Sequence, residues 1–215
     1  MSMCDYCKCT PRDINVLGMK KEYKACMQPS WHIRAVQNGD MYCDHIVYNI
    51  TPRISMSMTT SPFVTKNKYV TRRNWTDRTT QRFQKGTLFK AVRSNYGGEV
   101  IGIGEITDNP YKQNTGNDIT LNGMIELHRA EGFRYLDEQW VRINDWKLPE
   151  KLSIESLKNY ENLPLIKATY RWINSNQILT VVPFKVIEVF PGMEAKYTTE
   201  EEIVRCVKAL QKAIG

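Results

Sequence analysis

The sequence predicts one α+β domain in which a small barrel or curled sheet is surrounded by helices. Its 215 residues suit a single domain, and its 41% hydrophobic and 25% charged residues are ordinary for a globular protein. Segments with strand and helix signals are mixed, without the regular strand–helix–strand alternation of a doubly wound sheet. The last segment carries a clear helix signal. These observations favour a curled sheet over an open parallel one.

The first half of the chain carries mainly strand signals. Enrichment in Val, Ile and aromatic residues, or alternation of apolar with polar ones, predicts strands or extended segments at 41–48, 54–59, 69–74, 87–92 and 99–107. Between them, Ser61-Pro62-Phe63 predicts the start of a short helix. Residues 79–84 suit one or two helical turns that end at Gly86.

The second half is mainly helical. Helices are predicted at 119–131 and 135–143, separated by Gly132, and helical pieces at 152–174. A long strand follows at 177–190, and Pro183 within it predicts an edge position or a bend. The terminal helix, 198–214, begins with a Thr-Thr cap and three glutamates, which favour a helix N-terminus.

The positive charge is concentrated in one part of the sequence. The chain has a net charge of +7, whereas residues 66–93 alone hold nine basic residues and one acidic residue, a local charge of +8. Such a distribution suits an anionic partner such as nucleic acid.

The segment from Lys68 to Trp75 is the main candidate for a binding site. On an extended strand Thr71, Arg73 and Trp75 share one face, while Arg72 and Asn74 share the other. A guanidinium can pair with phosphate or stack on a base, and an indole can stack on a base. The alternative is a solvated edge strand whose Trp75 covers the core.

Two further features point to acid–base chemistry. Lys68 and Thr71 meet only if the chain bends between them, in which case a neutral lysine could activate the threonine hydroxyl. The glycines of Gly102-Ile103-Gly104 predict a bulge or a close backbone approach. Glu105 follows them, and it either faces solvent or serves as an acid or base in a pocket.

The order and spacing of several short motifs resemble the ASCH family of the PUA-like superfamily. They lie within residues 45–190 and comprise Lys68-x-x-Thr71-x-Arg73, Phe83-x-Lys85-Gly86-x-Leu88-Phe89-Lys90, Ile103-Gly104-Glu105-Ile106, Glu131-Gly132-Phe133, Gln139-Trp140 and the 182–189 strand. The resemblance implies a small PUA-like β-barrel surrounded by helices. We therefore expect a cysteine-containing N-terminal extension at 1–44, the domain at 45–192, and a C-terminal helix at 193–215 packed on it.

The resemblance implies binding of RNA, single-stranded nucleic acid or a modified nucleoside in a basic cleft. Ligand contacts are then expected from Arg72, Arg73, Asn74, Trp75 and Arg93. Some bacterial members hydrolyse the amide of N-acetylated cytidine with Lys, Thr and Glu. Those positions match Lys68, Thr71 and Glu105, so a nucleoside amidohydrolase is the alternative. A third interpretation is a protein-interaction module for an acidic partner.

The remaining expectations concern cysteines and location. The start of the chain has no signal-peptide pattern, and no long apolar run occurs, so we expect a cytoplasmic or nuclear protein without a membrane partner. Six cysteines in a reducing compartment predict thiols, and no cofactor is expected. The alternative is zinc bound by Cys4, Cys7 and Cys9, with Cys26, His32, Cys43 or His45 as the fourth ligand. His128, on a predicted helix, is expected at the surface.

Overall fold

The computed structural model describes residues 12–13, 24–25, 52–94, 98–116, 120–146 and 163–214. Near the N-terminus, β1 (Arg12–Asp13) pairs antiparallel with β2 (Lys24–Ala25). The predicted strand at 41–48 and most of the predicted extension at 1–44 lie outside these residues.

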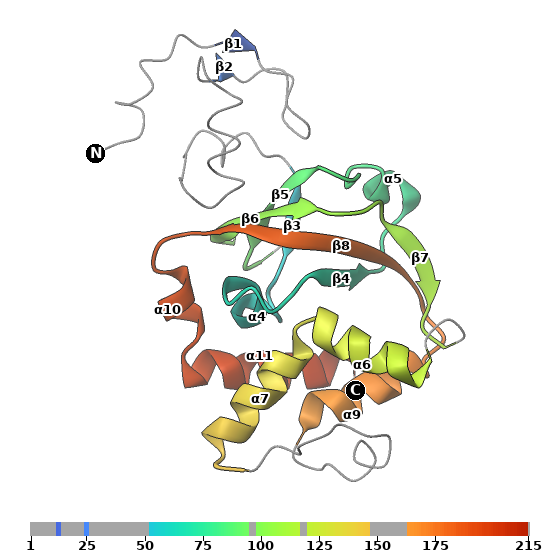
Figure 1. Cartoon of the computed structure of the whole chain (residues 1–215), viewed down its shortest axis with the longest axis vertical. Helices are drawn as coiled ribbons and strands as arrows, with labels where there is room; N and C mark the ends of the chain where they lie inside the picture. The colour runs from blue at the N-terminus through green and yellow to red at the C-terminus, as the bar shows by residue number, and fades with distance from the viewer. Residues whose placement is uncertain are drawn as a thin grey trace.

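A curled, half-barrel sheet organises the rest of the described chain (Figure 1). Its strand order is β3-β5-β6-β8-β4, with β7 also pairing to β8. The strands are β3 (Arg53–Ser55), β4 (Val70–Arg73), β5 (Leu88–Val92), β6 (Val100–Ile106), β7 (Tyr111–Asn114) and β8 (Ile178–Val189). All pairings in this sheet are antiparallel except that of β3 with β5. The two end strands, β3 and β4, are not paired to each other.

Strand β8 connects the two halves of the sheet. It pairs with β6 through Phe184–Val189 and with β7 through Ile178–Val181, while β4 pairs with residues 180–183. Along β8, the pairing with β7 ends at Val181 and the pairing with β6 begins at Phe184, so Pro183 lies between the two partners. The strand is thus central, and the expected edge position is wrong. Proline is tolerated because its missing N–H falls at the change of partner.

Seven helices are present in the described residues. They are α4 (Thr60–Val64), α5 (Asp77–Thr80), α6 (Leu121–Ala130), α7 (Phe133–Ile143), α9 (Pro164–Ile173), α10 (Met193–Tyr197) and α11 (Glu200–Ile214). Figure 1 shows α6, α7, α9 and α11 gathered on one side of the sheet, with β4 the nearest strand. These helices are therefore positioned to cover the open side of the curled sheet.

Two apolar clusters stabilise this arrangement. One joins the helices and contains Leu136, Trp172 and Val207 from α7, α9 and α11. The other lies within the curl of the sheet and contains Phe63, Phe89 and Phe184. Burying such side chains contributes about 1.5–3 kcal/mol each. The terminal helix α11 therefore belongs to the helical layer, and its Leu210 is buried there.

Most predicted elements in the described residues are confirmed, including the strands at 87–92, 99–107 and 177–190 and the helices around Gly132. The strand expected at 54–59 is wrong in its second half, because β3 ends at Ser55 and α4 begins at Thr60. Strand β7 was not predicted. The predicted glycine effect is confirmed: the β6–β8 register shifts at Ile103/Gly104, and a Cβ on Gly104 would lie 2.3 Å from Phe89. In the described segments, no helix is both long and apolar enough to span a membrane.

Candidate functional site

A pocket lies where the ends of β3 and β4 face the helical layer. It contains about 430 Å³ of space free of protein atoms, its open mouth included. The cavity that a water molecule can occupy within this space is about 70 Å³. It is lined by Ser55, Ser57, Met58, Thr59, Lys68, Thr71, Arg72, Arg73, Glu131, Phe133, Trp172, Leu210 and Ile214. The pocket thus contains the Lys-x-x-Thr-x-Arg motif singled out in the sequence.

A buried carboxylate links two of the basic residues. The Lys68 ammonium donates hydrogen bonds to the Glu131 carboxylate and, at 3.1 Å, to the Glu131 carbonyl oxygen. The second carboxylate oxygen of Glu131 accepts from Arg72 Nη1 at 3.3 Å. Arg72 Nε also donates to Gln113 Oε1 at 3.1 Å, so its guanidinium is held between α6 and β7. These contacts fix Lys68 and Arg72 on one carboxylate.

Gly132 allows Glu131 to lie beside Lys68. It adopts the left-handed conformation, with φ of 78°, between α6 and α7. A Cβ there would lie 2.4 Å from Pro62 Cβ, so only glycine lets α6 end this close to α4. The amide of Tyr69 donates to the Ala130 carbonyl at 3.0 Å, which ties the start of β4 to the end of α6. Lys68 therefore lies directly beside Glu131.

The environment changes the acidity of Lys68. Desolvation by burial lowers its pKa to about 8, although the carboxylate of Glu131 acts in the opposite direction. A lysine with this pKa is neutral in an appreciable fraction of molecules near pH 7 to 8. It can accept a proton in that form, which an ordinary surface lysine cannot do efficiently.

Thr71 and Arg73 project from β4 toward the same pocket. Thr71 is buried, with 2% of its surface exposed. The Arg73 guanidinium donates to the Ser55 carbonyl oxygen. Because Arg73 belongs to β4 and Ser55 to β3, this contact bridges the two unpaired ends of the curled sheet. The pocket is located at this seam.

Part of the pocket lining, its apolar wall, consists of apolar side chains. It is formed by Phe133 of α7, Trp172 of α9, and Leu210 and Ile214 of α11. The pocket therefore combines a polar floor, from β4 and the end of α6, with an apolar wall from three helices. Such a division suits a flat, partly polar ligand.

The structure corrects the predicted grouping of Lys68, Thr71 and Glu105. Glu105 is not among the pocket residues. It pairs with Lys185 Nζ at 3.0 Å, across the register between β6 and β8. The carboxylate beside Lys68 is Glu131 instead. Its signal was available in Glu131-Gly132-Phe133, where a glycine at a helix end marks a special backbone position.

Other predicted ligand contacts lie away from the pocket. Trp75 stacks on Phe83 with ring centroids 4.5 Å apart, so one face of its indole is occupied by the core. This is the arrangement of the alternative interpretation, in which Trp75 covers the core. Asn74 is exposed and does not line the pocket. Arg93 also lies outside the pocket.

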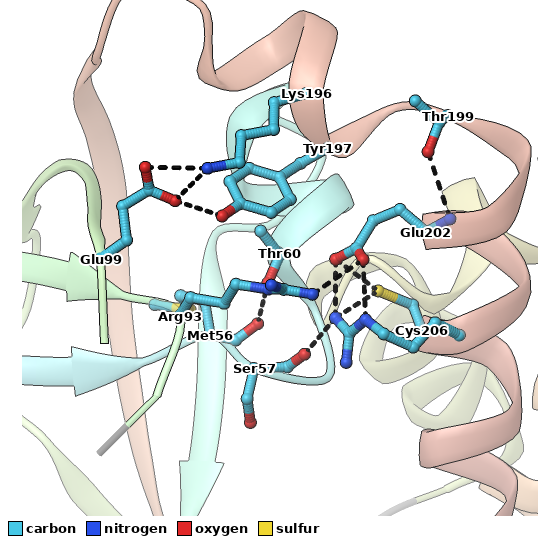
Figure 2. Close-up of polar contacts among 11 residues, drawn as sticks. Met56, Ser57, Thr60, Arg93, Glu99, Lys196, Tyr197, Thr199, Glu202 and Cys206 are labelled. Carbon is cyan, nitrogen blue, oxygen red and sulfur yellow. Dashed lines mark hydrogen bonds and ion pairs between the residues drawn. The ribbon is translucent and has the colours of Figure 1, made fainter. Parts of the chain in front are cut away.

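Arg93 belongs to a polar cluster beside α11 (Figure 2). Its Nη2 lies 3.2 Å from Glu202 Oε2, and its guanidinium is 5.0 Å from the centre of the Tyr197 ring. Glu202 also pairs with Arg205 at 2.7 Å, and Arg205 donates to the Ser57 carbonyl at 2.6 Å. Ser57 lines the pocket. The cluster thus supports the pocket from outside.

The basic segment is not one continuous surface. Of its nine basic residues, Lys68 and Lys90 are buried, and burial lowers the pKa of both. Arg72, Arg73 and Arg93 make the contacts described above. The exposed remainder comprises Lys66, Arg78, Arg82 and Lys85.

The remaining residues singled out in the sequence are His128 and the N-terminal cysteines. The surface position expected for His128 is wrong: it is 2% exposed, and its Nε2 lies 3.0 Å from Asp137 Oδ2. Cys4, Cys7, Cys9 and Cys26 lie outside the described residues. Among the residues that the structure does describe, no group of three or more His, Cys, Asp or Glu could hold a metal ion.

Comparison with known proteins gives one structural likeness. No family model matches the sequence, and no curated protein does. Part of the chain aligns with the crystal structure of protein EF3133 from Enterococcus faecalis V583, described by the family model DUF984. The two chains are 15% identical, and the match covers 61% of this chain and 71% of that one, with a TM-score of 0.33. This likeness carries no assignment of family or activity.

Proposed function

We propose that this chain binds a nucleoside-class ligand, free or as a unit of RNA or single-stranded nucleic acid, in the pocket at the sheet seam. The observation that carries the proposal is the convergence of buried Lys68, Thr71 and Glu131 on one pocket with an aromatic wall. A nucleobase combines a flat apolar face with hydrogen-bonding edges. The face suits Phe133 and Trp172, and the edges suit the polar floor.

The sequence resemblance to the ASCH family supports the same ligand class. The motif residues Lys68, Thr71 and Arg73 line the pocket, and Glu131 begins another of the motifs that carry the resemblance. An extended cationic track for a long polyanion receives less support, because several basic residues of the 66–93 segment are buried or paired.

Calorimetric titration with the four ribonucleosides tests the proposal. At least one should bind, and Ile214→Trp should weaken binding about tenfold or more, because Ile214 is partly exposed and lines the pocket. Lys212→Trp is the matched control on the exposed side of the same helix. Binding of long RNA with steep salt dependence, in the absence of any nucleoside binding, would indicate a surface track and contradict the pocket.

A second candidate function is hydrolysis of the amide of an N-acylated cytidine. The specific observation in its favour is the pKa of Lys68, about 8, in the pocket that also contains Thr71. Neutral Lys68 would take the proton of Thr71 Oγ1 as that oxygen attacks the amide carbonyl. The resulting ammonium would return the proton to the departing amine, and water would then release the acid from the threonine ester. Glu131 replaces Glu105 as the carboxylate beside Lys68, and its contact orients the amine.

Release of cytidine from N4-acetylcytidine tests this candidate. Thr71→Val should abolish turnover, since valine keeps the shape but removes the hydroxyl. Thr107→Val, at an exposed threonine outside the pocket, should leave turnover unchanged. The wild-type rate should rise with pH through about 8, because the neutral form of Lys68 is the base. Equal rates for wild type and Thr71→Val would exclude Thr71 as the nucleophile.

A further inference from the structure

The charges around the pocket are unbalanced. Lys68, Arg72 and Arg73 line it, whereas Glu131 is the one carboxylate among the lining residues that the structure describes. The two oxygens of Glu131 are already engaged by Lys68 and Arg72. Arg73 is therefore the lining cation that forms no ion pair with a described residue, although the charge of the nearby Glu131 carboxylate acts to raise its pKa.

The contacts of Arg73 leave most of its donors available. Its hydrogen bond to the Ser55 carbonyl uses Nη2, and no ion pair within the described part of the chain includes it. A guanidinium has five N–H donors in a planar fork. Burial lowers the pKa of Arg73, which indicates that its charge is poorly solvated. A cation in this state gains when an anion binds beside it.

The seam explains why the guanidinium stays in place without a carboxylate. The contact with Ser55 anchors one end of the fork between β3 and β4, while the residue also lines the pocket. The fork is thereby held before any ligand arrives, so less side-chain entropy is lost on binding. Arg72 cannot serve in this way, because Gln113 and Glu131 already hold its guanidinium.

We infer that the ligand of this pocket carries an anionic oxygen group, as in the phosphate of a nucleoside monophosphate, and that Arg73 binds it. This inference rests on the proposed function and adds a charge requirement to it. Arginine binds phosphate and carboxylate through two parallel hydrogen bonds, so both groups share the required chemistry. Arg73 is then the residue that distinguishes nucleotides from nucleosides.

Matched pairs of ribonucleosides and their 5′-monophosphates test the inference on the full chain by calorimetry. The monophosphate should bind about tenfold more tightly than its nucleoside, in line with the strength of hydrogen bonds to charged groups. In Arg73→Gln this preference should fall to about twofold or less, because glutamine has no charge and lacks the planar fork of donors. Arg78→Gln, at an exposed position outside the pocket, should keep the full preference.

Competition identifies the group that is bound. Inorganic phosphate should displace the monophosphate from wild type at lower concentration than acetate does if the natural group is a phosphate, and the reverse order would indicate a carboxylate. Failure of both anions to compete would overturn the inference. Thermal unfolding of Arg73→Gln shows whether the variant is folded, and the competition on wild type does not depend on it.

The outcomes separate this inference from the proposed function. Nucleoside binding with no preference for monophosphates, or a preference that survives in Arg73→Gln, would contradict the role of Arg73. The proposed function would still stand. Absence of binding by both nucleosides and monophosphates would contradict the proposed function, and the inference with it.

Discussion

Lys68 and Glu131 lie 63 residues apart in the sequence, yet their side chains form a buried ion pair with 1% and 5% of their surfaces exposed. Such a pair contributes little to stability, because desolvating two charges offsets most of their attraction. Hydrophobic residues of similar size would stabilise the fold at least as well. The pair instead holds the Lys68 amine, whose pKa is lowered to about 8, in the lining of a pocket.

We expect Glu131→Gln to lower the pKa of Lys68 below the value of about 8 in the wild type. The negative charge of Glu131 raises this pKa, whereas desolvation lowers it, and the substitution removes the opposing effect. NMR titration of 13C-labelled lysine side chains measures the change directly. Any reaction that uses neutral Lys68 would then reach its maximal rate at a lower pH.

Glu105→Gln is the matched control for this titration. Glu105 pairs with Lys185 and lies outside the pocket, so the Lys68 pKa should not move. A wild-type Lys68 that titrates near its ordinary value of 10.5 would contradict the prediction.

Gly132 and Gly192 form a second residue-scale comparison. Both have φ of 78°, but a Cβ would lie 2.4 Å from Pro62 Cβ at Gly132 and would meet nothing within 4 Å at Gly192. Alanine at either position costs about 1–2 kcal/mol in the left-handed conformation. We expect Gly132→Ala to lose about 1–3 kcal/mol more, from the forced displacement of α4 or α6. Urea unfolding measures both values, and equal losses would contradict the argument.

At the scale of elements, one buried carboxylate joins three helices. Asp137 of α7 accepts hydrogen bonds from the amides of Leu165 and Ile166, each at 3.0 Å, in the first turn of α9. His128 of α6 contacts the same carboxylate. A helix N-terminus leaves its first amides without partners and carries partial positive charge, so an aspartate satisfies both needs. This contact orients the apolar wall of the pocket, because Trp172 belongs to α9.

Asp137→Ala should therefore destabilise the protein by about 3–5 kcal/mol, because two buried amides and a histidine lose their acceptor. The neighbouring Glu138→Gln is the control on the same helix. Glu138 makes an exposed i,i+4 pair with Arg134, and its loss should cost about 0.5 kcal/mol or less. Denaturant unfolding of the two variants measures the contrast. A similar loss in both would show that the carboxylate is not a structural centre.

At the scale of the whole molecule, the sheet curls until its two end strands face each other without pairing. Side chains and backbone groups then meet at the seam, with Arg73 bridging from β4 to Ser55 of β3. Helices cover this side of the sheet, so the seam becomes a pocket instead of an open edge. The same folding separates the cations of the basic segment into buried, paired and exposed groups.

This separation predicts how binding responds to salt. If the ligand is one nucleotide, replacing the exposed Lys66, Arg78, Arg82 and Lys85 together with glutamine should leave mononucleotide affinity within about twofold, because all four lie outside the pocket. The dependence of affinity on salt should correspond to about one or two phosphates, not to a long track. Fluorescence titrations over a salt series measure both. A steep salt dependence that is lost in the variant with all four substitutions would instead locate binding on the exposed surface.

The sequence by itself determined the α+β class, most elements in the described parts of 52–214, and the choice of Lys68, Thr71 and Arg73, which line one pocket. The fold class and the elements follow from local periodicity and turn residues, and each such signal lies within one short stretch of the chain. Glu131-Gly132-Phe133 was also visible as a motif. The spacing of residues could not tell whether Glu105 or Glu131 approached Lys68, because both are distant in sequence from it.

Only the tertiary structure decided that contact. The turn at Gly132, which lies close against Pro62 of α4, brings Glu131 to Lys68, while the β6–β8 register places Glu105 beside Lys185. Tertiary packing likewise buried His128 against Asp137, nine residues further along the chain, and placed Trp75 against Phe83. In each case the contact depends on how helices and strands pack together, which the type and spacing of the residues do not fix.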